Sequence, residues 1–159
     1  MFDKQNVEDI YFLSPMQAGM LFHSLKDTEQ HTYFEQLDFP IKGELSVELV
    51  EQAANHVISR YSVLRTAFLY KNVSKPLQVV LKQRPIKADY RDIRHLNEQQ
   101  QHTYLTDLKN ADKAKGFSLS GDPLTRYTVV QRGDESWNLI WSYHHILMDG
   151  WCFGIVMDD

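Results

Sequence analysis

The chain has 159 residues, which is enough for one compact domain and too few for two domains of ordinary size. With 43% hydrophobic and 12% aromatic residues it can bury a substantial core, and this excludes an intrinsically disordered chain. The formal net charge is −4 and no stretch carries five like charges in a row, so the composition argues against a nucleic-acid-binding protein.

Membrane insertion and secretion are also disfavoured by the sequence. The longest segment without Asp, Glu, Lys or Arg, residues 10–25, is shorter than the roughly 20 apolar residues that a membrane-spanning helix needs. The first nine residues are acidic and lack the apolar stretch of a secretory signal. The single cysteine, Cys152, cannot form a disulfide within the chain. These features predict a cytoplasmic protein.

The first predicted element is a helix over residues 15–26. Ser14 suits the N-cap, Pro15 suits the first helical position, and Gln17 completes a capping box. Four apolar residues at helical spacing are expected to pack into the core. They are Met16, Met20, Leu21 and Leu25.

The rest of the chain predicts alternating strands and helices. In chain order these are a strand over residues 33–41, an amphipathic helix over 46–61, two paired β-rich runs over 64–70 and 77–81, a polar surface helix over 97–115, and a hairpin of residues 124–131 and 137–143. A further apolar run, residues 151–157, predicts a buried helix that places Cys152 in the core.

The most unusual residues follow the last predicted strand. Because side chains alternate along a strand, His144 and His145 are expected to lie on opposite faces, where they do not converge on one target. One of them is a candidate for acid–base chemistry near neutral pH and the other for a structural role, and the pattern leaves open which. Asp149 can orient a histidine or pair with an arginine. Gly150 permits a tight turn, and its N–H can approach a reacting oxygen.

Metal binding and nucleophilic catalysis are weaker interpretations of the same segment. A metal site would use His144, His145, Asp149 and Cys152. Adjacent histidines on opposite faces make poor joint ligands, and none of the usual zinc spacings is present, so we expect no metal site. Cys152 as a nucleophile would need its own histidine and oxyanion donors.

Three segments together resemble the condensation domains of nonribosomal peptide synthetases. Residues 144–150, His-His-Ile-Leu-Met-Asp-Gly, match the His-His-x-x-x-Asp-Gly motif of that family at every fixed position. Residues 59–68 resemble its arginine-containing second motif, with Tyr61 where histidine is also common, and residues 13–23 are similar to its first motif. The seven-residue motif alone also occurs in other acyltransferases, whereas three motifs in this order are far more specific.

The resemblance implies an α/β fold of the chloramphenicol acetyltransferase-like type. Residues 1–159 are then the N-terminal lobe, a mixed β-sheet with helices packed against it, and the C-terminal lobe is absent. Because the far wall of the substrate tunnel belongs to that second lobe, we expect the lobe alone to be inactive. If Met1 is the native start, the donor arrives from another protein and residues 1–12 help to dock it.

The implied activity is that of an amide-bond-forming acyltransferase in peptide antibiotic biosynthesis. An acyl or peptidyl thioester on the phosphopantetheine arm of one carrier protein is joined to the α-amine of an aminoacyl thioester on the next. An α-amine has a pKa of about 7.7–8.0 and must lose a proton before the amide forms, so His145 either accepts that proton or positions the amine. The implied partners are the C-terminal lobe, the upstream and downstream peptidyl carrier proteins, and the adenylation domain. The lobe itself is expected to bind no cofactor.

The resemblance also assigns supporting roles. His144 and Asp149 are structural, and either Arg60 or Arg65 pairs with Asp149. Two histidines in place of aspartates favour condensation over heterocyclisation, although epimerisation relatives share them. Two alternatives remain: a non-catalytic lobe whose histidines shape a docking face for a carrier protein, and a coenzyme A-dependent acyltransferase of the same fold.

Overall fold

The computed structural model describes residues 3–26 and 31–159. Its strands are β1 (Val7–Phe12), β2 (Phe34–Lys42), β3 (Thr66–Leu69), β4 (Leu77–Leu81), β5 (Asp89–Asp92), β6 (Thr125–Gly133) and β7 (Ser136–His144). Its α-helices are α1 (Pro15–Lys26), α2 (Val47–Arg60), α3 (Glu98–Lys115) and α4 (Gly150–Asp158). Residues 1, 2 and 27–30 of the predicted lobe lie outside the described residues, and residues 1 and 2 also belong to the predicted docking segment.

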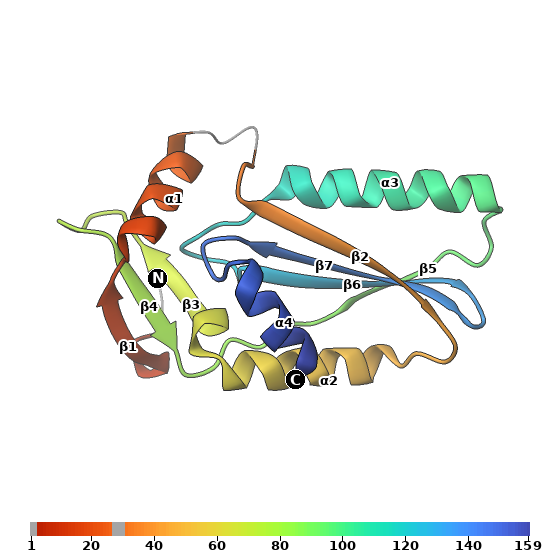
Figure 1. Ribbon diagram of the computed structural model, residues 1–159, viewed down its shortest axis with the longest axis horizontal. Coiled ribbons are helices and arrows are strands. Elements are labelled where there is room, and N and C mark those ends of the chain that lie inside the picture. The colour runs from red at the N-terminus through yellow and green to blue at the C-terminus, as the bar shows by residue number, and fades with distance from the viewer. Residues whose placement is uncertain (1–2, 27–30) are drawn as a thin grey trace.

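The described strands form two sheets. The smaller sheet has the order β1-β4-β3, and the larger has the order β2-β7-β6-β5. β7 pairs antiparallel with β2 and β6, whereas β5 pairs parallel with β6, so the larger sheet is mixed, as predicted. In Figure 1 the smaller sheet and α1 lie at one end of the molecule, and α3 runs along the larger sheet on the side opposite α2.

Local capping explains where three helices begin. The Ser14 hydroxyl accepts the N–H of Gln17, and the Gln17 side chain accepts the N–H of Ser14, which is the predicted capping box of α1. Ser46 caps α2 through the N–H of Leu49. Asn97 caps α3 in a second capping box. The helices predicted over residues 15–26, 46–61 and 97–115 are therefore confirmed to within a residue at each end.

Two core clusters lie on opposite faces of the larger sheet because successive residues of β7 alternate between them. Trp141 and Tyr143 belong to the main cluster, together with buried residues of α2. Ile140 packs in a smaller cluster with Leu105 of α3. The alternation predicted for the end of this strand is thus present along it.

The predicted burial of α1 is wrong for two of its four residues. Leu21 is buried and Met20 packs against the core, whereas Met16 and Leu25 are exposed, Met16 by 70%. Helical spacing predicts which side chains share a face, but it does not establish how far a neighbouring element covers that face.

The same limit applies to the apolar helix predicted over residues 151–157. This helix is α4, and its Cys152 and Phe153 pack against the main cluster as expected for core residues. Its other side is open: Trp151 is 89% exposed, and Ile155 and Met157 are also exposed. The expectation of a buried helix is therefore wrong for this side of α4.

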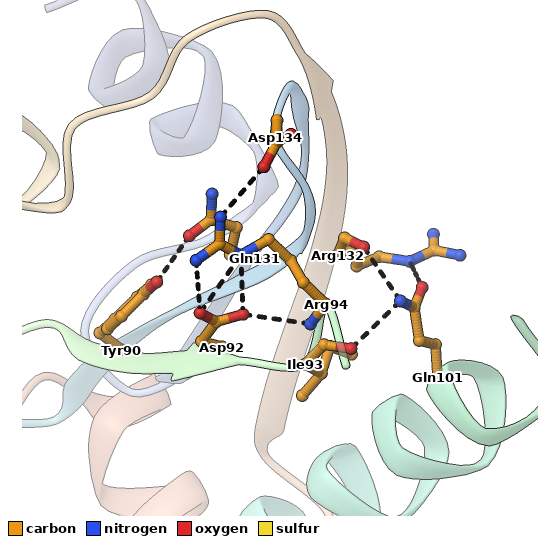
Figure 2. A network of polar contacts seen from close by, with 8 residues as sticks. All are labelled: Tyr90, Asp92, Ile93, Arg94, Gln101, Gln131, Arg132 and Asp134. Atoms are coloured by element: carbon orange, nitrogen blue, oxygen red, sulfur yellow. Dashed lines mark hydrogen bonds and ion pairs between the residues drawn. The ribbon is translucent and has the colours of Figure 1, made fainter. Parts of the chain in front are cut away.

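A polar network fixes the end of the larger sheet that lies far from the histidines (Figure 2). The Gln101 amide of α3 donates to the carbonyls of Ile93 and Arg132, at 3.2 and 2.9 Å. Arg94 pairs with Asp92 and with Asp134 at the β6–β7 turn. Hydrogen bonds from Arg94 lower the pKa of Asp92 to about 2. The network therefore ties the segment between β5 and α3 to the hairpin.

Among the described residues, no helix is both long and apolar enough to cross a membrane.

Candidate active site

The two histidines lie where β7 gives way to the turn before α4. The His144 N–H donates to the carbonyl of Leu124, and the His145 N–H donates to the carbonyl of Tyr33 at 2.8 Å. The N–H of Leu147 closes the turn on the His144 carbonyl at 3.1 Å. Main-chain hydrogen bonds to the segments before β6 and β2 therefore hold both histidines at the end of a central strand.

His144 is buried, with 6% of its surface exposed. Its Nδ1 accepts the N–H of Ile146 at 3.1 Å, and its Nε2 lies 3.3 Å from the hydroxyl of Ser24 in α1. Burial, and to a smaller extent the charge effect of the nearby His145, lowers the pKa of His144 to about 4. His144 is therefore neutral at physiological pH, and both of its ring nitrogens are engaged.

His145 differs from His144 in both respects. The residue is only partly buried. Its Nδ1 is enclosed and has no hydrogen-bond partner within residues 3–26 and 31–159. The residue is therefore not sealed in the core, and no hydrogen bond within the described ranges engages its Nδ1.

Asp149 caps α4. Its carboxylate accepts the N–H groups of Trp151 and Cys152 at 3.0 and 3.2 Å. Hydrogen bonds from the side chain and backbone of Cys152 are the main causes that lower the pKa of Asp149, and His145 contributes a smaller electrostatic effect. The side chain is exposed. Asp149 therefore has a structural role at the start of α4, and His145 lies close enough to affect the pKa of Asp149.

The predicted pairing of Asp149 with an arginine is wrong. Arg65 is buried and bonds the Glu8 carboxylate at 2.5 Å and two main-chain carbonyls. Arg60 is exposed and pairs with Asp159 at 3.0 Å. Asp149 needs neither arginine, because solvent and two helix N–H groups already stabilise its charge.

Gly150 is the first residue of α4, and the structure shows no feature there that requires glycine. A Cβ at this position would meet no atom within 4 Å, and the residue lacks the positive φ that favours glycine. The role of its N–H toward a reacting oxygen stays a prediction. As for metals, the described residues contain no cluster of three His, Cys, Asp or Glu side chains able to hold an ion.

A pocket of about 250 Å³ opens beside His144. Its walls come from α1, the start of β2, the segment after β3 and the segment after α3. The lining residues include Ser24, Tyr33, Tyr70, Phe117 and His144, while His145 is not among them. The two neighbouring histidines therefore face different surroundings, as the strand alternation predicts.

An ion pair holds one wall of this pocket. Arg126 of β6 lies 2.7 Å from the Asp112 carboxylate of α3, and its guanidinium stacks 4.0 Å from the centre of the Phe117 ring. The Ser142 hydroxyl of β7 donates to the same carboxylate at 2.6 Å. Phe117 in turn meets the His144 ring edge-on. Sequence reasoning missed these residues and Ser24, because no local spacing links them to the histidines.

This chain is similar in sequence to a known family and to large peptide synthases. The family model described as Condensation domain matches residues 7–159. Gramicidin S synthase 2 of Brevibacillus brevis is 44% identical over 158 residues, which are 99% of this chain and 4% of the relative. Tyrocidine synthase 2 of Brevibacillus parabrevis is 44% identical over 159 residues, which are 100% of this chain and 4% of the relative. The chain thus spans a small fraction of the curated relatives that it matches.

Solved structures share the fold. The starter condensation domain of rhizomide synthetase superposes with a TM-score of 0.83 at 21% identity, over 94% of this chain and 37% of that chain. A holo four-domain nonribosomal peptide synthetase bound to AMP and glycine gives 0.81 at 22% identity, over 95% of this chain and 11% of that chain. These matches confirm the predicted α/β fold, and the family match confirms the resemblance based on the three motifs. The chain belongs to the condensation domain family of nonribosomal peptide synthetases.

Proposed function

We propose that this chain is the N-terminal lobe of a condensation domain that joins two carrier-bound substrates through an amide bond, with His145 as the central residue. The observation that carries this assignment is the difference between the two histidines. Both ring nitrogens of His144 are engaged and its pKa is about 4, so it is a poor base near neutral pH. His145 is partly exposed and its Nδ1 has no hydrogen-bond partner among the described residues.

In the proposed reaction, the α-amine of the acceptor attacks the thioester carbonyl of the donor. The C–N bond forms as the C–S bond breaks, the amine loses a proton, and the donor's carrier arm leaves as a thiol. His145 accepts this proton or holds the amine by a hydrogen bond, while the main-chain bond to Tyr33 fixes the residue in place. Both substrates arrive on the phosphopantetheine arms of carrier proteins, which the lobe does not itself bind as a cofactor.

A second lobe is the proposed partner for the open side of α4. Trp151, Ile155 and Met157 expose apolar surface there, and surface of this kind is typical of an interface. The upstream and downstream peptidyl carrier proteins and an adenylation domain are the further proposed partners, because the curated relatives are peptide synthases many times longer than this chain. The cytoplasmic location predicted from the sequence stays a prediction.

A coupling assay tests the function. We would join this chain to the second lobe of the matching domain of tyrocidine synthase 2 and supply loaded donor and acceptor carrier proteins. We expect His145→Ala to lower the rate of dipeptide formation at least about 100-fold, since a positioned proton acceptor contributes about 100- to 10,000-fold. His102→Ala, which changes an exposed histidine in α3, is the matched control.

Two outcomes would contradict the proposal. If a His145→Ala fusion forms dipeptide as fast as the parent, His145 is not catalytic, and a lobe that only docks carrier proteins is the better interpretation. A parent fusion that accepts coenzyme A thioesters and ignores carrier-bound donors would instead indicate a coenzyme A-dependent acyltransferase.

A further inference from the structure

The hydrogen bonds around His144 determine which of its ring nitrogens carries the proton. The Ile146 N–H points at Nδ1 from 3.1 Å, so Nδ1 must offer its lone pair. A neutral imidazole has one N–H, which therefore lies on Nε2. The group facing Nε2 is the hydroxyl oxygen of Ser24 at 3.3 Å, and it accepts this hydrogen bond. The opposite tautomer would place two N–H groups against each other at Nδ1.

The ring therefore links α1 to the turn that carries His145. On one side His144 is bonded to Ser24, in a helix 120 positions earlier in the chain. On the other side it holds the N–H of Ile146, the residue directly after His145. The His145 N–H is itself bonded to the carbonyl of Tyr33. The N–H of His145 and the N–H of Ile146 are therefore both held by hydrogen bonds. The second of these bonds depends on the orientation of the His144 ring.

Loss of the Ser24 hydroxyl would leave the Nε2–H of the buried His144 without its acceptor among the described residues. Such a group is unfavourable, because it loses its bond to water on burial and gains none in return. The ring can relieve this cost by rotating or by moving its proton to Nδ1, and either change breaks the bond to Ile146. The turn that presents His145 would then be less rigid.

We propose that Ser24 is a positioning residue for amide-bond formation: it accepts the Nε2–H of His144 and so fixes the turn that presents His145. This inference rests on the function proposed above. Ser24 acts through His144 and does not itself need to touch the substrate.

The tautomer is tested by NMR on the 159-residue chain labelled with ¹⁵N-histidine. We expect the His144 signals of a neutral ring with a protonated Nε2 and an unprotonated Nδ1. Ser24→Ala should shift or broaden both signals, whereas Ser24→Thr, which keeps a hydroxyl, should restore them. Ser59→Ala is the matched control, because the Ser59 hydroxyl bonds the His56 carbonyl within α2. A parent His144 that carries its proton on Nδ1 would overturn the inference.

Kinetics on the two-lobe fusion give the second readout. Loss of one neutral hydrogen bond corresponds to about a fivefold to tenfold decrease in kcat. We expect that decrease in Ser24→Ala with KM unchanged, and recovery in Ser24→Thr. Equal kcat values for the parent and Ser24→Ala would overturn the positioning role. A parent fusion that forms no dipeptide would contradict the proposed function alone, because the NMR result decides the tautomer independently.

Discussion

The protonation of His144 predicts how the stability of this fold depends on pH. The pKa of His144 falls from its ordinary value of 6.5 to about 4 in the folded chain, chiefly because the ring is buried. Between these two values the unfolded chain binds a proton that the folded chain does not. Acidification therefore favours unfolding, and the stability present above pH 6.5 is lost as the pH falls toward 4.

The size of this effect follows from the two pKa values. Each pH unit within the window costs up to about 1.36 kcal/mol of unfolding free energy. The loss is about 2 kcal/mol between about pH 7 and pH 5, and it reaches about 3 kcal/mol below about pH 4. The comparison is cleanest near pH 5, because the carboxyl groups with lowered pKa values, Asp92 and Asp149, stay charged there.

The matched variant is His144→Asn. Its side-chain carbonyl can still accept the Ile146 N–H, but it has no group that titrates in this range. Urea unfolding at about pH 7, 6 and 5, followed by tryptophan fluorescence, would measure both proteins. We expect the variant to be less stable at neutral pH and to lose about 2 kcal/mol less than the parent on acidification to about pH 5.

A second variant controls for the replacement of a histidine by asparagine in general. His56→Asn changes an exposed ring in α2 and should keep the pH dependence of the parent. If the parent and His144→Asn lose the same stability over this pH range, His144 is not held neutral by burial, and the reasoning fails.

Three further predictions concern Arg65, Asp149 and Gly116. Arg65→Met should lower the unfolding free energy by about 3 kcal/mol, because it leaves two carbonyls and the Glu8 carboxylate without their partner. Glu8→Gln should lower it by at most about 1 kcal/mol. Equal losses in urea unfolding would contradict this reasoning. Asp149→Ala should lower the melting temperature and Asp149→Asn should preserve it, since asparagine also caps helices; equal losses by circular dichroism would refute a capping role. Gly116→Ala should lower the unfolding free energy by about 1 kcal/mol or more, because Gly116 has a φ of 57° and a Cβ there would lie 2.6 Å from Nδ1 of His31. An unchanged midpoint of urea unfolding would refute this prediction.

Much of the fold is predictable because its signals are local. Ser14, Ser46 and Asn97 each cap a helix through a backbone group three residues ahead, and such spacing is visible in sequence. The hairpin of β6 and β7 is equally local. The edge strands β1 and β5 were not predicted: β5 has four exposed residues, and its parallel pairing with β6 depends on a partner about 40 positions away.

The site shows the same division. Strand alternation predicts that His144 and His145 have different surroundings, and it depends on adjacent positions only. The partner of Asp149 could not be predicted, because an exposed N-cap and a buried ion pair use the same residue type at the same position. Ser24 and Arg126 reach the site from other elements through contacts that depend on the assembled fold.

The unbroken register between β2 and β7 has a consequence for engineering peptide synthetases by recombination. Nine consecutive pairs run from Phe34 opposite His144 to Lys42 opposite Ser136. A crossover between parental genes anywhere from residue 43 to residue 135 would take these two strands from different parents. Productive chimaeras should therefore inherit both strands from one parent, and exchange boundaries are better placed outside residues 34–144.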